Sequence, residues 1–249
     1  MKETILKKLN EIERTENVKI LLAVESGSRA WGFASPDSDY DVRFIYVRQK
    51  NEYLRLDRGR DVIEYPIDDV LDINGWDLDK ALKLLYKSNP TLFEWFSSPI
   101  IYKETPFADG FRSVMRGYFS SKRGLSHYLS MARNNYREYL RGDTVKAKKY
   151  FYVLRPVLAC QWILDHDSLP PMLFSELMEA ELAADIRPEV ERLLELKQKS
   201  PEIKLISKIE ALNWYLDKSI EEVLERIRKL PDGPPKDWEA LNQLFLEQL

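Results

Sequence analysis

The chain has few of the side chains that bind soft metals or form disulfides. Among its 249 residues are one cysteine, Cys160, and two histidines, His127 and His166. A single cysteine excludes an internal disulfide and a cysteine-rich metal site. Two histidines argue against a zinc site built mainly from imidazoles. Any metal site predicted from this sequence therefore has to use oxygen ligands.

The sequence also lacks a long apolar run and a strong excess of one charge. No stretch approaches the roughly 18 apolar residues that a membrane-spanning helix needs, and Met1–Asn10 is typical of a charged amphipathic helix rather than an apolar signal segment. The net charge of −3 excludes a globally basic protein that coats nucleic acid, although 38 Lys and Arg leave room for a local basic groove. We expect a cytoplasmic protein with no membrane partner.

Two kinds of sequence pattern, in different parts of the chain, predict an α+β protein. Val18–Val24 and Tyr40–Val47 are apolar, β-branched runs typical of buried strands, and further strands are expected near 61–65 and 70–76. We expect an N-terminal α/β domain at 1–105 and an all-helical domain at 106–249. The helical domain is predicted from long amphipathic stretches at roughly 110–141, 144–165, 172–182, 187–198, 202–214 and 218–229.

The most informative stretch of the chain runs from residue 25 to residue 46. Gly27 and Ser28 follow the first expected strand, and a spacer of ten residues separates Ser28 from Asp39 and Asp41. Residues i and i+2 of a strand share a face, so we expect the two carboxylates side by side. A phosphate can approach Gly27 closely because glycine has no Cβ. The turn also offers backbone N–H groups and the Ser28 hydroxyl as donors.

Paired carboxylates beside such a turn favour the binding of a metal–nucleotide complex. Oxygen ligands suit Mg²⁺, and such metals act on the attacking and leaving oxygens of phosphoryl transfer. This chemistry needs a third carboxylate from a neighbouring strand, for which Asp61, Glu64, Asp72 and Asp77 are candidates. Asp72 is favoured because it lies inside an expected strand. Asp77 is its rival, but an aspartate at the N-cap of the next helix is structurally useful without chemistry.

These residues resemble the signature of the DNA polymerase β-type nucleotidyltransferases, which is a Gly-Ser pair, a spacer and an Asp-x-Asp. More narrowly, Ser26–Arg43 resembles the predicted nucleotidyltransferases of the RNA repair pathway DNA polymerase β family. The segments Asp72–Leu82, Lys87–Tyr102 and Lys148–Pro156 are similar to that family as well. The resemblance covers most of residues 15–160 and is weaker in the rest of the chain.

The resemblance implies a polymerase-β-like domain with a mixed sheet, followed by a helical domain that closes the nucleotide cleft. Carried over position by position, Asp39 and Asp41 would hold Mg²⁺ or Mn²⁺, and Asp72 would activate the acceptor or complete the site. Ser28 would contact the triphosphate of an NTP substrate. The family name implies an RNA 3′ end as the acceptor, for instance in the repair of cleaved RNA.

Basic residues supply further candidates for nucleotide binding. Arg29 and Arg43 either contact phosphate or pair with the acidic cluster and offset its repulsion. Lys148, Lys149, Tyr152 and Arg155 lie at spacings of three and four and form a basic-aromatic stripe on one expected helix, of which Lys149 and Arg155 are the candidates for nucleotide binding. In this superfamily the helices after the catalytic domain often grip the nucleotide, and the alternative for this stripe is a solvated helix face. Glu25 is either a fourth acidic ligand or a hydrogen-bonding structural residue.

The main prediction is a Mg²⁺-dependent nucleotidyltransferase that transfers a nucleoside monophosphate from an NTP to an acceptor hydroxyl and releases pyrophosphate. Two other functions are open. Small members of the superfamily act as antitoxins that transfer AMP to a partner protein, although they usually lack such a long helical domain. A non-catalytic nucleotide or RNA sensor would be expected to lack a motif carboxylate, whereas Asp39 and Asp41 are both present.

Overall fold

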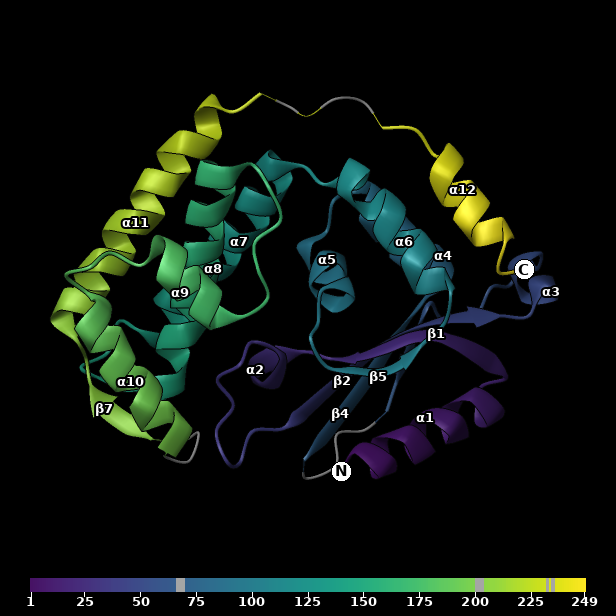
Figure 1. Ribbon diagram of the computed structural model, residues 1–249, viewed down its shortest axis with the longest axis horizontal. Helices are drawn as coiled ribbons and strands as arrows, with labels where there is room; N and C mark the ends of the chain where they lie inside the picture. The colour runs from purple at the N-terminus through teal and green to yellow at the C-terminus, as the bar shows by residue number, and fades with distance from the viewer. Residues whose placement is uncertain (66–69, 200–203, 232, 234–235) are drawn as a thin grey trace. The chain divides into compact units, whose positions relative to one another are not determined.

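The computed structural model describes residues 1–65, 70–199, 204–231, 233 and 236–249, and it divides into two compact units (Figure 1). The first unit comprises Met1–Ala30, Asp39–Tyr118 and Pro235–Leu249. The second unit comprises Trp31–Ser38 and Phe119–Pro234. The domain boundary expected between residues 105 and 106 stays a prediction, and each unit is described by itself.

A five-stranded sheet with the order β3-β4-β2-β1-β5 forms the centre of the first unit. Strands β2 and β4 are parallel, and the other neighbouring strands are antiparallel, so the predicted mixed sheet is confirmed. The first four strands were expected, whereas the short β5 was not. The strands are β1 (Val18–Glu25), β2 (Tyr40–Arg48), β3 (Val62–Glu64), β4 (Leu71–Asp77) and β5 (Ile101–Glu104).

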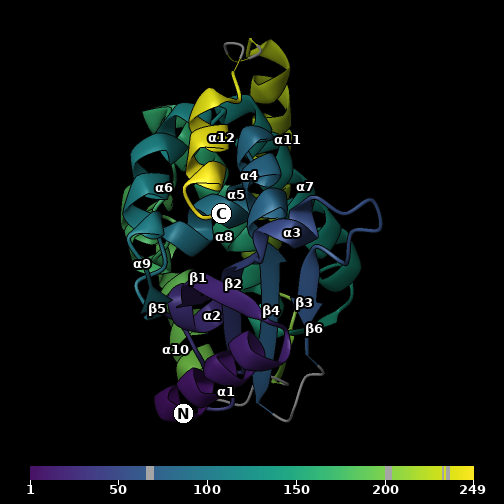
Figure 2. The same cartoon turned by 90° about the vertical axis from the view of Figure 1, so that its right-hand side faces the viewer.

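Helices cover both faces of this sheet (Figures 1 and 2). On one face, α1 (Lys2–Thr15) buries Ile5, Leu9 and Ile12 completely, and each contributes roughly 1.5–3 kcal/mol to folding. On the other face, α4 (Leu78–Tyr86), α5 (Pro90–Phe96) and α6 (Phe107–Met115) contact β1, β2 or β4. The further helices of this unit are α2 (Gly27–Ala30), α3 (Lys50–Tyr53), the 3₁₀ helix Arg116–Tyr118 and α12 (Glu239–Leu246).

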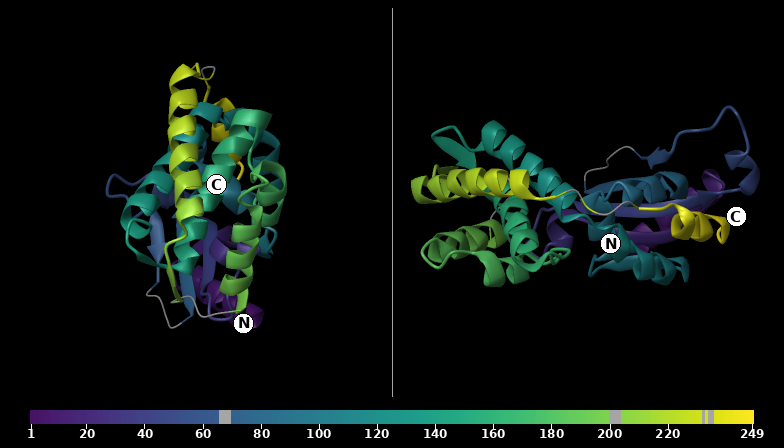
Figure 3. Two further views of the ribbon diagram at one scale, coloured as in Figure 1. Left: turned by 90° about the vertical axis from the view of Figure 1, so that its left-hand side faces the viewer. Right: turned by 90° about the horizontal axis from the view of Figure 1, so that it is seen from above.

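The second unit is organised around α8 (Ala147–His166), which is buried along most of its length. The helices α7 (Ser121–Tyr139), α9 (Phe174–Glu181), α10 (Arg187–Lys199) and α11 (Glu210–Lys229) contact it (Figure 3). Of the helices in the described part of the chain, none is both long and apolar enough to cross a membrane.

Two expectations for this region are wrong. Strands β6 (Thr144–Lys146) and β7 (Leu205–Ser207) form a two-stranded antiparallel sheet, so the region is not all-helical. Strands of three residues are too short to show a recognisable alternation in the sequence. The two helices expected at 202–214 and 218–229 are the single helix α11 (Glu210–Lys229), and the part of this prediction at 202–203 lies outside the described residues.

The loop Trp31–Ser38 packs within the core of the second unit. Phe33 is 1% exposed, and its ring centroid lies 5.2 Å from that of Phe151 and 5.3 Å from that of Phe174. The buried Lys197 on α10 donates from Nζ to the Phe33 carbonyl and to the Ser35 hydroxyl, at 3.0 Å each. The spacer between the two halves of the motif is therefore held by side chains of the second unit.

Candidate active site

The candidate site lies at the end of the sheet where strand β1 finishes and strands β2 and β4 begin. The parallel register of β2 and β4 sets Asp41 directly opposite Asp72. Strand β1 ends at Glu25, which is opposite Val42, and α2 starts two residues later at Gly27. The fold therefore brings the Gly-Ser turn and two of the predicted carboxylates to the same end.

Arg43 bridges these two carboxylates. Its Nη2 donates to Asp41 Oδ1 at 3.1 Å and to Asp72 Oδ2 at 2.7 Å. Its Nη1 donates to the backbone carbonyls of Val42 and Asp72 at 3.1 and 3.0 Å. The guanidinium group offsets the repulsion between the two carboxylates, whose side chains are 30% and 28% exposed. Of the two roles open for Arg43, the ion pair is present in the structure, and a phosphate contact stays a prediction.

Gly27 is required by the position of Asp41. Its φ is +59°, and a Cβ at this residue would lie 2.1 Å from Asp41 Oδ2. The backbone N–H of Ser26 also donates to the Asp41 carbonyl at 2.8 Å, which fixes the turn against β2. The expected reason for this glycine is the close approach of a phosphate. In the structure, the group that approaches it closely is the Asp41 carboxylate. Ser28 is buried in α2, and its contact with a triphosphate stays a prediction.

Glu25 is fully buried and holds the backbone of Asp41 through a hydrogen bond. Its Oε1 accepts a hydrogen bond from the Asp41 N–H at 2.7 Å, and its Oε2 accepts one from the Tyr102 hydroxyl. Burial raises the pKa of the Glu25 carboxyl, and the hydrogen bond from Tyr102 opposes that rise. The hydrogen-bonding role of Glu25 is therefore confirmed. Tyr102 was missed because β5 was not expected, although the short β-branched run at 100–101 is a weak strand signal.

Asp39 lies one residue before β2 and is exposed, so strand alternation does not set its direction. Its carbonyl accepts a hydrogen bond from Arg29 Nε at 3.1 Å. The Arg29 guanidinium lies 3.7 Å from the centroid of the Tyr40 ring, which is a cation–π contact. Arg29 therefore ties the end of the spacer to the first residue of β2, and its contact with phosphate stays a prediction.

Asp77 lies at the opposite end of the sheet, five residues beyond Asp72 and thus roughly 16 Å along β4. It is 4% exposed, and its Oδ1 accepts hydrogen bonds from the Asp79 N–H at 3.0 Å and the Tyr53 hydroxyl at 2.9 Å. The predicted N-cap of α4 is confirmed. Burial raises the pKa of the Asp77 carboxyl. Its N–H donates to the Asp61 carbonyl, which places Asp61 at this end as well.

Comparison with known proteins matches residues 1–247 to the RNA repair pathway DNA polymerase beta family. The chain belongs to this family. It is 48% identical over 249 residues to the protein YcgL of Bacillus subtilis (strain 168), over 99% of this chain and 95% of that protein. It is also similar to the crystal structure of a nucleotidyltransferase-like protein from Exiguobacterium sibiricum 255-15, at 11% identity and a TM-score of 0.33, over 98% of this chain and 79% of that one. The predicted family resemblance is confirmed, and membership indicates a transferase of the nucleotidyltransferase type.

The donor set at the site suits the divalent cation that a nucleotidyltransferase family implies. Asp41 and Asp72 offer partly exposed carboxylate oxygens, and they already hold a positive charge, the Arg43 guanidinium, between them. Hard cations such as Mg²⁺ and Mn²⁺ prefer such oxygens. Within the described ranges, no three acidic, histidine or cysteine side chains are grouped so that they could hold a metal ion as they stand. The participation of Asp39 as a third ligand stays a prediction.

The two predicted nucleotide-binding residues of the basic stripe belong to the second unit. Lys149 Nζ lies 3.6 Å from the ring centroid of Tyr139 and 4.8 Å from that of Tyr152. Arg155 is 2% exposed, with its guanidinium 4.6 Å from the Trp31 ring centroid. Arg155 is therefore a core residue of this unit and not part of a solvated helix face. Contact of either residue with a nucleotide stays a prediction.

Proposed function

We propose that this protein is a Mg²⁺-dependent nucleotidyltransferase that transfers a nucleoside monophosphate from an NTP to the 3′ hydroxyl of an RNA and releases pyrophosphate. The observation that carries the proposal is the direct pairing of Asp41 and Asp72 across β2 and β4, beside the turn at Gly27. Family membership supports nucleotidyl transfer, and the family's description supports RNA as the acceptor.

The roles of the residues follow from their positions. Asp39, Asp41 and Asp72 would hold the metal, which when bound would neutralise charge on the triphosphate and favour deprotonation of the acceptor hydroxyl. Ser28 and the backbone N–H groups of the turn would donate to the triphosphate. The acceptor oxygen bonds to the α-phosphorus as the bond to pyrophosphate breaks, and the hydroxyl proton passes to Asp72. Glu25 holds the backbone of Asp41 in place throughout.

The test is to incubate the full-length protein with Mg²⁺, one labelled NTP at a time, and an RNA oligonucleotide with a free 3′ hydroxyl. We expect label at the RNA 3′ end and one pyrophosphate per nucleotide transferred. The same RNA with a 3′ phosphate should stay unlabelled. Asp41→Asn should abolish transfer without unfolding the protein, because a partly exposed carboxylate that faces another is not needed for folding.

Three other outcomes would contradict the proposal in different ways. Label on a co-purified protein in place of RNA would support AMP transfer to a protein partner. Binding of NTP without turnover, with or without RNA, would support a nucleotide sensor. If the protein gives no labelled product and binds no NTP, nucleotide chemistry at this site is excluded.

A further inference from the structure

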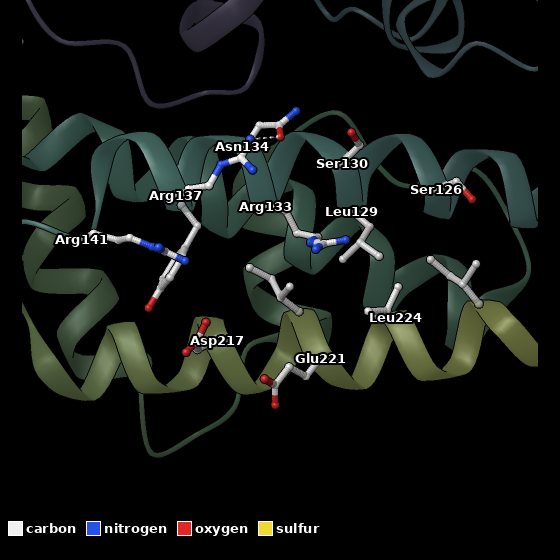
Figure 4. Close-up of a pocket in the computed structure, with 13 residues that line it drawn as sticks. Ser126, Leu129, Ser130, Arg133, Asn134, Arg137, Arg141, Asp217, Glu221 and Leu224 are labelled. Carbon is white, nitrogen blue, oxygen red and sulfur yellow. Dashed lines mark hydrogen bonds between the residues drawn. The ribbon is translucent and has the colours of Figure 1, made fainter.

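A groove in the second unit lies between α7 and α11 (Figure 4). Its volume is about 730 Å³, which is in the range of pockets that bind small molecules and cofactors. All of its lining residues come from α7, from Arg141 just after it and from α11. The groove therefore belongs to one unit and shares no residue with the candidate active site.

One wall of the groove carries a row of arginines. Arg133 and Arg137 lie on α7 and Arg141 follows just after it, so successive side chains are spaced by four residues, or about 6 Å along a helix. All three are exposed. Arg137 Nη2 donates to Asn134 Oδ1 on the same helix at 3.2 Å. Among the residues that the structure describes, no carboxylate forms an ion pair with any of the three arginines.

The opposite wall carries the opposite charge. Asp217 and Glu221 lie one turn apart on α11, which forms the other side of the groove, and the Asp217 carboxylate points toward α7 (Figure 4). Both are exposed. The ligand that this arrangement favours has a line of anionic groups on one side and hydrogen-bond donors on the other.

The apolar floor of the groove leaves little surface for an amphipathic helix of a partner protein. Leu129, Ile220 and Ile227 are only 5%, 7% and 9% exposed, because they are already part of the core of the unit. Helix-in-groove recognition depends on apolar anchors that fill open apolar pockets. The groups available to a ligand are thus mainly the charged side chains of the walls, together with the partly buried Tyr136 and Leu224.

A single strand of RNA has the required chemistry. Its phosphodiesters form a line of anions that arginines bind through charge-assisted hydrogen bonds. Its exposed base amino groups and 2′ hydroxyls are donors that carboxylates accept. In a duplex, base pairing already uses most of these amino groups, so a single strand fits better than a double strand.

We propose that the groove between α7 and α11 binds single-stranded RNA, with the phosphodiester chain along Arg133, Arg137 and Arg141 and the bases and riboses toward α11 and its Asp217. The inference rests on the proposed function, for which it names a surface of the second unit that binds RNA. The binding itself needs neither NTP nor metal.

The test measures binding of a fluorescently labelled single-stranded RNA by anisotropy, without NTP. Arg133→Glu with Arg137→Glu should lower the affinity at least about tenfold and reduce the slope of log K against log salt by about 1.4, because two phosphate contacts are lost. The matched control is Arg192→Glu with Lys199→Glu on α10, whose side chains are 71% and 76% exposed. This control makes the same charge change and should alter the affinity by less than about twofold. Equal losses in the two variants, or no loss in the groove variant, would overturn the proposal.

Two further measurements separate this inference from the proposed function. The groove variant should bind NTP as the wild type does, and Asp41→Asn should bind RNA as the wild type does. If the wild type binds RNA through the groove but never transfers a nucleotide, the proposed function fails and the groove stands. If nucleotide transfer occurs and the groove variant keeps the wild-type KM for RNA, the groove proposal fails alone.

The acidic wall distinguishes RNA from a simple anion. Asp217→Asn with Glu221→Gln should lower the preference for RNA over inorganic polyphosphate, used as a competitor, because the polyphosphate has no donors to offer. An unchanged preference would contradict the placement of bases and riboses against α11.

Discussion

Strand β4 has an aspartate near each of its two ends, and the two side chains lie in opposite environments. Asp72, near the start of the strand, is 28% exposed and shares Arg43 with Asp41. Asp77, at the end, is 4% exposed and accepts hydrogen bonds from Tyr53 and from the backbone of α4. The first carboxylate keeps oxygens that a ligand can reach, and the second uses its oxygens to start a helix. Residue type alone therefore does not identify a catalytic aspartate. Accessible oxygens beside a second carboxylate are the better indication.

The largest expected effect separates the two aspartates by activity. Asp72→Asn should lower kcat/KM for nucleotide transfer by about a thousandfold, because proton transfer and metal binding both depend on this carboxylate. Asp77→Asn should change it by less than about threefold, because asparagine also caps helices well. Transfer of labelled NTP to RNA measures both variants. If Asp77→Asn shows the larger loss, the third carboxylate is Asp77.

The next effect concerns the turn that faces Asp41. Gly27→Ala should cost about 1–3 kcal/mol of unfolding free energy and at least about tenfold in transfer, because the methyl group would meet Asp41 Oδ2 and the positive φ disfavours alanine. Gly59→Ala is the matched control, since its Cβ would meet no atom within 4 Å. It should change stability by less than about 0.5 kcal/mol. Urea unfolding measures both, and equal costs would mean that the turn is not fitted to Asp41.

A smaller effect tests the cation between Asp41 and Asp72. Arg43→Gln should lower the unfolding free energy by about 1 kcal/mol, because the two carboxylates are left to repel each other. Added Mg²⁺ should raise Tm more for this variant than for the wild type, because Mg²⁺ bound only to the folded state stabilises it. Arg48→Gln, which loses the contact with Asp77 at the other end, should show no such extra response. Equal Mg²⁺ responses in the two variants would contradict a cation site at Asp72.

The smallest effect is a pH dependence at the Asp77 end of the sheet. Burial raises the pKa of Asp77 above its ordinary 3.8, so its contribution to stability is fully present below that value and is lost as the pH rises through the raised pKa. The unfolding free energy of wild type minus that of Asp77→Asn should therefore fall as the pH rises above about 3.8. Urea unfolding of both proteins across this range measures the difference. A difference that grows with pH would show that Asp77 is stabilised as an anion.

Local sequence patterns predicted the part of the site that local chemistry determines. The apolar runs that became β1 and β2 position Glu25 and Asp41, and the N-cap preference of aspartate identified the role of Asp77. Asp72 was preferred because it lies in an expected strand. The strand pairing that sets it opposite Asp41 is nevertheless a tertiary feature, because the two residues are far apart in the chain.

Other parts of the site depend on contacts that no local pattern contains. Tyr102 reaches Glu25 from β5, a four-residue strand without a clear alternation. The clearance between Gly27 and Asp41 depends on how β1 and β2 are placed beside each other. Arg155 is predicted either to bind the nucleotide or to lie on a solvated helix face, but the packing of α8 at the centre of its unit buries it.

The position of Phe33 limits how the chain can be divided into fragments that fold. A fragment that ends at Tyr118 would contain every motif carboxylate, yet Phe33 would have lost Phe151, Phe174 and the backbone support of Lys197. The ring would then be exposed to water, and the spacer would lose the contacts that hold its conformation. The N-terminal part that carries the motif is therefore not an independent module. A transplant of its motif into another scaffold, or an exchange of the helical part, would have to carry the partners of this one ring along with it.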